Sequence, residues 1–442
     1  VVLEEDLMPE EKAKILKEKK AEVAPAGIKN LGNTCYMNAT LQCMLKVGDL
    51  RAKLDAYAGP GAEERDIDSV LTTQLKGVMG QLNSTTDSIT PLQFVMALRQ
   101  RFPRFAEMQN GGYMQQDADE CLRGLLTVLS GTLPGQDGAN AVDGLFGFKL
   151  QSTLKCLECD EEPPQTSEEL QRVMICHLGT QTEPVSHIHQ GVQLSLKEHI
   201  EKNSPVLSRN AQYEKNSRLA SLPPYLVVQF ARFGYKGAND WAGTSASKVK
   251  LTRKCAFSHT FDAFDCASDE LKKQLSIGRV KKKEQEDEAL EREKQAKVGK
   301  SSSSSAPATS GEDVEMKPAE DVEMKPTGVE EIDTGYYQLI AIVSHKGRTA
   351  DGGHYVGWTL HRKADGKELK DDKWVLFDDD DVTFLNWKDM VGLSTDLQGG
   401  KVDTQIAYIN IYKKVTVTVD QGKTLGGKEA TDAAPAEASG TA

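Results

Sequence analysis

Residues that can hydrolyse an acyl bond together stand far apart in this sequence: Cys35, His354 and the acids that begin at Asp378. A cysteine attacks as its thiolate, and a helix N-terminus or a histidine partner lowers the pKa of a thiol. The small polar run Gly32 to Thr34 precedes the cysteine and would let a substrate backbone come close. The alternative is a buried structural cysteine, which is the common location of a free thiol.

His354 follows two glycines and begins a segment of alternating apolar residues, which predicts a strand over 354–361. An ordinary histidine at a strand edge is the alternative. A second predicted strand, 373–377, runs directly into the acids Asp378 to Asp381. Four acids after a strand are by themselves typical of a solvated turn.

The turn between these two strands indicates which acid faces the histidine. Asp365-Gly366 is a good hairpin pair, and position 366 lies midway between His354 and Asp378. An antiparallel hairpin about this turn brings His354 beside Asp378, which could hold the imidazole tautomer and stabilise its charged form. Asp379 and Asp380 are the alternatives if the register differs by a residue or two.

Periodicity predicts the helix that would carry the cysteine. Apolar residues recur after Cys35 with helical spacing, at Met37, Leu41, Met44 and Leu45. Asn33 or Thr34 would cap this helix, which puts Cys35 in or near its first turn. Acyl transfer also needs donors for the oxyanion. The candidates are the backbone N–H of Cys35 and the side chain of Asn30, whereas Asn33 fits the capping role better.

The remaining elements predict an α+β chain. A helix is expected over 118–129, with Asp117 and Glu120 as a capping pair, and residues up to about 150 look mainly helical. Beyond 150 the pattern is strand-like, and further strands are expected at 225–230, 336–344 and near 405–413.

Domain boundaries follow from composition. We expect a charged lead-in over 1–26, a catalytic domain over 27–413 and a disordered tail over 414–442. The stretch of about 269–333 opens with a Lys/Glu-rich, helix-like segment and continues through serines and a near-repeat, so we interpret it as a flexible insertion. The first residue is Val rather than Met, and we expect an upstream domain to be missing.

The composition limits the classes of partner that the chain is expected to bind. The chain has 442 residues and a formal net charge of −12, which argues against nucleic acid as the main partner. Eight irregularly spaced cysteines in a chain of this length indicate reduced thiols, as in the cytoplasm or nucleus. No apolar run approaches the roughly 20 residues needed to cross a bilayer, so no membrane association is expected.

The motifs resemble, in order, those of the ubiquitin-specific proteases. Residues 27–38 resemble the cysteine box of that family, and 113–120 resemble its Gln-Asp box. Residues 222–233 are similar to the palm strand, and the two segments 352–356 and 374–379 are similar to the histidine box. The match covers about 27 to 413.

The resemblance implies a papain-like fold with a helical thumb and a β-rich palm and fingers. It implies that Cys35 is the nucleophile, His354 the general base, Asp378 the orienting acid and Asn30 an oxyanion donor. The expected reaction is cleavage of the isopeptide or peptide bond after the C-terminal glycine of ubiquitin.

The ubiquitin tail is expected to thread a narrow, glycine-lined cleft. Gly353 and Tyr355 are therefore candidate substrate-binding residues. Asp117 and Glu120 are further candidates, because acids suit the arginines of the tail. Capping of their own helix explains those two acids equally well.

Two stretches, 35–43 and 204–213, resemble most the proteasome-associated branch of the family. This implies the 26S proteasome regulatory particle as a partner, reached through an N-terminal ubiquitin-like domain that is missing here. It also implies that loops over the tail cleft inhibit the free enzyme.

Many members of the family hold zinc in the fingers with two Cys-x-x-Cys pairs. Here only Cys156 and Cys159 form such a pair, and Cys176 with His177 is a poor substitute. Because a zinc site wants four ligands, we expect no metal and no other cofactor. Two alternatives to an active deubiquitinase stay open: a catalytically silent ubiquitin-binding module and a hydrolase for another ubiquitin-like modifier.

Overall fold

The structure is a computed structural model, and it describes residues 24–59, 66–135, 140–180, 182–236, 247–300, 329–347, 352–362, 372–391, 397–401 and 404–420. Its helices gather mainly in the N-terminal part of the chain and its strands mainly in the rest, so the fold is α+β. The chain separates into two compact units, Val1–Gln274 with Gly335–Val415 and Leu275–Thr334 with Thr416–Ala442. None of the described helices has the length and apolar character that a membrane crossing requires.

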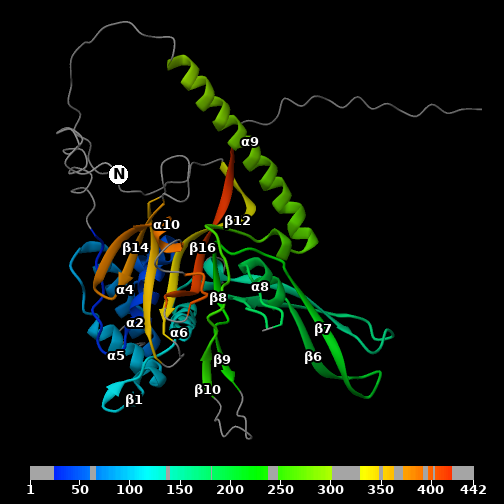
Figure 1. Cartoon of the computed structure of the whole chain (residues 1–442), viewed down its shortest axis with the longest axis horizontal. Coiled ribbons are helices and arrows are strands. Elements are labelled where there is room, and N and C mark those ends of the chain that lie inside the picture. The colour runs from blue at the N-terminus through cyan, green and yellow to red at the C-terminus, as the bar shows by residue number, and fades with distance from the viewer. Residues whose placement is uncertain are drawn as a thin grey trace, which may run out of the picture. The chain divides into compact units, whose positions relative to one another are not determined.

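The N-terminal part of the larger unit is helical, as predicted. Its helices are α2 (Cys35–Leu45), α3 (Gly48–Ala56), α4 (Ile67–Ser84), α5 (Leu92–Arg101), α6 (Ala118–Thr132) and α7 (Ala141–Phe146), with a short 3-10 turn, η2 (Pro103–Ala106). Every residue of α2 from Cys35 to Met44 is buried, so this helix lies inside the unit and not on its surface. Figure 1 draws α2 in blue, next to the yellow and orange strands of the main sheet.

The main sheet has eight strands in the order β15-β14-β13-β12-β16-β8-β5, with β11 paired to β12. Their bounds are β5 (Met174–Cys176), β8 (Tyr225–Phe230), β11 (Thr260–Asp262), β12 (Val329–Lys346), β13 (His354–Arg362), β14 (Lys373–Asp378), β15 (Asp381–Asn386) and β16 (Ile406–Asp420). The pairs β12–β13, β13–β14 and β14–β15 are antiparallel, whereas β5 pairs with β8 in parallel. The strands expected near 225, 336, 354, 373 and 405 are therefore all present.

A second, four-stranded sheet has the order β4-β3-β7-β6, made of β3 (Phe148–Cys156), β4 (Gln165–Gln171), β6 (Lys197–Ser204) and β7 (Arg209–Leu219). Two small hairpins complete the strands: β1 (Met108–Gln109) with β2 (Gly112–Tyr113), and β9 (Phe233–Lys236) with β10 (Ser247–Lys250). The other helical elements are α8 (Ile188–Ser195), η4 (Phe264–Cys266), α9 (Asp269–Lys300) and α10 (Trp387–Val391).

Helix α2 packs directly on β13, and a glycine makes this approach possible. A Cβ atom at Gly357 would lie 3.2 Å from the carbonyl oxygen and 3.4 Å from the Cα of Ala39. Asn38 and Gln42 on α2 donate to the main-chain carbonyls of Ile28 (3.1 Å) and Ala26 (2.8 Å). These contacts fix the helix between the chain that leads into it and the strand that begins at His354.

The hairpin β13–β14 differs from the predicted register. Gly357 pairs with Phe377 and Trp358 with Leu376, so the continued register places Val356, and not His354, opposite Asp378. The prediction was therefore shifted by two residues along one strand. Since side chains two apart on a strand share a face, His354 still lies diagonally across from Asp378. A bulge between Leu360 and Arg362 adds a further shift, and the predicted turn lies outside the described residues.

The structure describes parts of the predicted insertion and of the predicted tail. The predicted flexible insertion begins as helix α9, whose Lys/Glu-rich sequence favours a helix, and its end belongs to β12; only 301–328 lie outside the described residues. The predicted tail is wrong for 414–420, because β16 continues to Asp420 through alternating Val and Thr. Within the smaller unit, Gln285 Nε2 donates to the carbonyl of Thr418 (2.8 Å). Residues 1–23 and 421–442 also lie outside the described parts.

Candidate active site

Cys35 is the first residue of α2, as predicted, and it is 2% exposed. The N–H groups of a first helical turn have no partner inside the helix, and the helix dipole makes this end positive. The thiol is buried, but it does not face a purely apolar interior. Polar groups from two other segments reach its sulfur, so the geometry does not fit an inert structural cysteine.

The predicted cap of α2 is wrong. Thr34 occupies the N-cap position, but its side chain makes no capping bond and accepts from the N–H of Leu31 (2.9 Å). Asn33 adopts a left-handed backbone, with φ of 52°, and its Nδ2 donates to the carbonyl of Tyr113 (2.7 Å). The Thr34 side chain therefore stabilises the turn before the helix and that of Asn33 joins the turn to Tyr113, so neither caps α2.

His354 lies between a carboxylate and the thiol. Its Nε2 hydrogen-bonds to Oδ1 of Asp378, and the main-chain N–H of the next residue, Tyr355, lies 3.4 Å from the sulfur of Cys35. The bond to Asp378, followed by the bond to Cys35, raises the pKa of His354 to about 10. The same bond to His354 lowers the pKa of Asp378. At neutral pH the imidazole is therefore charged, and it can pair with a thiolate.

Asp379 contacts amide groups rather than the histidine. Its Oδ2 accepts from Nδ2 of Asn30 (2.9 Å), and its Oδ1 accepts from Nδ2 of the buried Asn38 (2.7 Å). The main chain of Asp379 is left-handed, with φ of 54°, and its carbonyl accepts from the N–H of Ile28 (2.9 Å). Asp380, the other alternative for the third group, is exposed. Of the three acids, Asp378 is the one that the structure places on His354.

Asn30 is held on both ends of its side-chain amide. Its Oδ1 accepts from the N–H groups of Gly32 (3.0 Å) and Thr34 (3.2 Å), while its Nδ2 donates to Asp379. An amide nitrogen carries two N–H groups. Within the described residues Asp379 is the one acceptor bonded to this nitrogen, so its second N–H can point to another oxygen.

Two further donors reach the sulfur of Cys35. The main-chain N–H of Tyr355 lies 3.4 Å from Sγ, and Nε2 of Gln115 lies 3.0 Å from it. Gln115 lies within the 113–120 segment that resembles the Gln-Asp box, but no role was predicted for it. Its only signal was membership in that motif, because a contact across 80 positions leaves no local pattern.

The four predicted substrate-binding residues lie in two places. Asp117 and Glu120 lie at the start of α6, whereas Gly353 and Tyr355 lie on either side of His354. Asp117 caps α6 through the N–H of Asp119 and accepts from the hydroxyl of Tyr408 at 2.9 and 3.0 Å. Burial is the main reason that the pKa of Asp117 is raised to about 6. Glu120 is exposed and pairs with Arg104 at 3.2 Å, so it does not act as a second capping group in this structure.

Gly353 and Tyr355 flank the histidine. Gly353 has a φ of 124°, a conformation that L side chains rarely adopt, so a glycine is required there. Tyr355 is 1% exposed, and its ring packs at 4.6 Å from that of His345. Its hydroxyl is buried without a hydrogen-bond partner in the described part of the chain.

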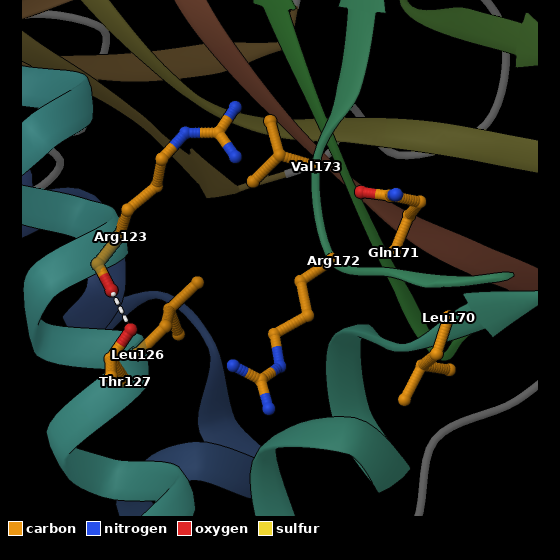
Figure 2. Close-up of a pocket in the computed structure, with 7 residues that line it drawn as sticks. All are labelled: Arg123, Leu126, Thr127, Leu170, Gln171, Arg172 and Val173. Atoms are coloured by element: carbon orange, nitrogen blue, oxygen red, sulfur yellow. Dashed lines mark hydrogen bonds between the residues drawn. The ribbon is translucent and has the colours of Figure 1, made fainter.

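A cavity of about 580 Å³ opens beside the histidine, and it is lined by Lys346, Gly347, Gly353, His354, Val356, Trp358, Leu376, Asp378 and Gln405. Another cavity, of about 410 Å³, lies between α6 and the end of β4 (Figure 2). There Arg123 and Leu126 come from α6, and 170–173 form the opposite wall. Arg123 pairs with Asp119 (2.7 Å) and Arg172 with Asp143 (2.6 Å). Neither cysteine nor histidine is among the residues that line this second cavity, so it does not offer the thiol chemistry of the first.

The zinc site of related proteins does not fit these residues. Cys156 and Cys159 pack in a small apolar cluster with Tyr213. Beside them the buried carboxylate of Glu162 accepts from the hydroxyls of Tyr213 (2.9 Å) and Ser204 (2.7 Å). Among the described residues, the group of three or more metal-ligating side chains that converge is His354 with Asp378 and Asp379, at the histidine and not at this pair.

Comparisons with known proteins agree with this geometry. Residues 26–412 match the family described as ubiquitin carboxyl-terminal hydrolase. The chain is 37% identical over 398 residues to ubiquitin carboxyl-terminal hydrolase 6 of Arabidopsis thaliana, covering 88% of this chain and 77% of that protein. It is 32% identical over 403 residues to hydrolase 6 of Schizosaccharomyces pombe (88% and 78%) and 30% identical over 416 residues to hydrolase 14 of Caenorhabditis elegans (91% and 76%).

Proposed function

Because the chain belongs to the ubiquitin carboxyl-terminal hydrolase family, we propose that Cys35, His354 and Asp378 carry out its hydrolysis of bonds at the ubiquitin carboxyl terminus. The enzyme is a thiol-dependent hydrolase. The observation that carries the assignment is the hydrogen bond of the His354 imidazole to the Asp378 carboxylate, on a strand whose next residue, Tyr355, donates its main-chain N–H to the Cys35 sulfur. This arrangement supplies a nucleophile, a proton carrier and an orienting acid in one connected set.

The reaction follows from the charges of this set. The Cys35 thiolate attacks the carbonyl carbon of the terminal glycine, and the tetrahedral intermediate collapses to a thioester. The His354 imidazolium gives its proton to the leaving amine of the substrate protein. The neutral imidazole then takes a proton from water, which attacks the thioester and releases the ubiquitin carboxylate. Asp378 keeps the ring oriented and stabilises its charged form through both steps.

Asn30 and the main-chain N–H of Cys35 are our candidates for the oxyanion donors. Donors that are fixed before the reaction stabilise the developing charge most effectively. The bonds of Asn30 to Gly32, Thr34 and Asp379 support a fixed orientation. Asp379 therefore acts as a positioning residue for Asn30 rather than as the acid on His354.

We further propose a thumb of helices, a palm formed by the eight-stranded sheet and fingers formed by the four-stranded sheet, with papain-like chemistry between thumb and palm. The ubiquitin tail would pass Gly353 and Tyr355 and meet the acids Asp117 and Glu120. Asp117 bonds to Tyr408 in the free chain, so a tail arginine must share or displace that hydroxyl. The body of ubiquitin would cover the cavity of Figure 2, whose two walls come from the thumb and the fingers.

The 26S proteasome regulatory particle is our proposed partner, with the cytoplasm and nucleus as the compartments. The resemblance of 35–43 and 204–213 to the proteasome-associated branch supports this partner. Co-sedimentation of the full-length protein with purified proteasomes tests it. Activity measured with and without proteasomes shows whether the free enzyme is inhibited.

Ubiquitin with a C-terminal electrophile tests the catalytic assignment. We expect a covalent adduct at Cys35, located by peptide mass spectrometry, and none with Cys35→Ala. Cys43→Ala is the matched control, because Cys43 lies on the same helix, is also buried and does not contact His354 in the described structure.

The other outcomes identify the alternatives. Tight binding of ubiquitin without an adduct, with or without proteasomes, would indicate a silent ubiquitin-binding module. An adduct only with a different modifier, carrying the same electrophile, would indicate a hydrolase for that modifier. An adduct at a cysteine other than Cys35 would overturn the proposed nucleophile.

A further inference from the structure

The sulfur of Cys35 has a hydrogen-bond donor that the triad does not require. Nε2 of Gln115 lies 3.0 Å from Sγ, closer than the main-chain N–H of Tyr355 at 3.4 Å. A neutral thiol is a weak acceptor, whereas an anionic sulfur accepts N–H groups strongly. A donor aimed at this atom therefore stabilises the thiolate more than the thiol.

The segment that carries Gln115 is fixed by contacts on its N-terminal side. The carbonyl of Tyr113 accepts from Nδ2 of Asn33 (2.7 Å), and the guanidinium of Arg99 lies 3.4 Å over the Tyr113 ring. The N–H of Met114 donates to the carbonyl of Glu107 (2.9 Å). Two residues after Gln115, Asp117 is the N-cap of helix α6. The amide is thus presented to the sulfur from a backbone that is held at both ends.

The oxygen of the Gln115 side-chain amide gives a second, independent observation. Oε1 of Gln115 is buried and has no hydrogen-bond partner in the part of the chain that the structure describes. A buried acceptor without a donor is costly, and such atoms in native proteins usually await a water, an ion or a ligand. With Nε2 on the sulfur, Oε1 is placed to receive a donor that arrives at the nucleophile. An extended peptide tail offers main-chain N–H groups of this kind.

We propose that Gln115 is a further catalytic residue, whose amide nitrogen stabilises the Cys35 thiolate and whose amide oxygen receives a main-chain N–H of the bound tail. This proposal rests on the assignment of Cys35 as the nucleophile. It gives one neutral side chain two tasks, one in the free enzyme and one in the complex. The two tasks predict separate effects, on thiol reactivity without substrate and on KM with substrate.

Alkylation measures the first task without any substrate. The rate at which iodoacetamide modifies Cys35 is measured from pH 5 to 10, with peptide mass spectrometry to distinguish Cys35 from the other cysteines. For Gln115→Leu we expect the midpoint of this profile to move up by about one pH unit, as loss of one hydrogen bond to a charged group implies. Gln115→Glu places a carboxylate beside the sulfur and should move the midpoint further.

Gln116→Leu is the matched control, because Gln116 is the neighbouring glutamine and makes no bond to the sulfur in the described structure. Its alkylation profile should coincide with that of the wild type. Circular dichroism and melting temperature show whether Gln115→Leu folds. If it does not, the nearly isosteric Gln115→Glu provides the measurement alone.

Turnover of a fluorogenic ubiquitin C-terminal amide measures the second task. At pH 7 we expect Gln115→Leu to lower kcat about tenfold, with partial recovery near pH 9, and to raise KM several-fold. An alkylation midpoint that stays at the wild-type value in both Gln115 variants overturns the thiolate role, and an unchanged KM overturns the tail contact. If Cys35 itself is not the nucleophile, Cys35→Ala retains turnover, which separates that failure from a failure of Gln115.

Discussion

Replacing Asp379 by asparagine distinguishes the role of Asp379 from that of its neighbour Asp378. Asn tolerates the left-handed backbone at this position, with φ of 54°, so the change removes the charge without adding backbone strain. The carboxylate now serves Asn30 and Asn38 with one oxygen each. An asparagine offers one oxygen, so one of the two amides loses its acceptor and faces an N–H group instead.

The structure gives a magnitude for each loss. The bond to Asn38 is buried, and a hydrogen bond to a charged group contributes about 1.5–3 kcal/mol. We therefore expect Asp379→Asn to lower the free energy of unfolding by roughly that amount. The bond to Asn30 is only partly buried, so it adds little to stability. Its loss releases the side chain of Asn30, our proposed oxyanion donor, and loss of one such donor lowers kcat about 10²–10³-fold.

A double-mutant cycle tests whether Asp379 acts through Asn30. The kcat of Asn30→Ala, Asp379→Asn and the double variant is measured with the fluorogenic ubiquitin substrate, and unfolding is followed in urea. We expect the double variant to be no slower than Asn30→Ala alone, because both changes remove one function. Asp380→Asn is the control, since it removes an equal charge from an exposed neighbour. Additive losses in the double variant would refute the reasoning, as would a normal kcat in Asn30→Ala.

Three further outcomes are expected. Asp378→Asn removes the main cause of the raised pKa of His354, so the imidazolium loses its proton at lower pH. We expect the alkaline limb of the kcat/KM profile to move to lower pH, and a limb that stays in place contradicts the pairing. Because the pKa of Asp117 is about 6, this acid becomes neutral as pH falls below 6, and KM for ubiquitin should rise there in the wild type but not in Asp117→Asn. Glu162→Ala leaves the buried hydroxyls of Tyr213 and Ser204 without their acceptor, so it should lower the free energy of unfolding by about 1–3 kcal/mol. A chelator should not change the melting temperature of the wild type, and a chelator effect would point to a bound metal.

The sequence predicts those parts of the site that depend on local patterns. The helical spacing after Cys35 places it in the first turn of a helix, and the alternation after His354 predicts the strand. The pairing of His354 with Asp378 was predicted from a register that is wrong by two residues. It holds because a shift of two residues keeps side chains on the same face of the sheet.

Two contacts between distant segments of the chain could not be predicted from the sequence. Asn38 meets Asp379 across 341 positions, and Gln115 meets Cys35 across 80, and neither contact has a periodic signature. The predicted N-cap of α2 was wrong for a different reason. Thr34 has the right residue type at the right position, but its hydroxyl bonds to the N–H of Leu31 in the preceding turn. Strand β15 was not predicted, because it begins at Asp381, the last of the four acids, and aspartate is depleted in strands.

The packing of α2 on the strand that begins at His354 also has a consequence for biosynthesis. The sulfur of Cys35 bonds to an N–H group 320 positions later in the chain. A ribosome adds about 5–20 residues per second, so the nascent cysteine waits about 15–60 s for its partners to be translated. During that interval the polysome carries a thiol that has no imidazole beside it and cannot act on neighbouring conjugates. We therefore expect catalytic competence only after His354 has been translated, and an inert product when translation stops before the codon of His354.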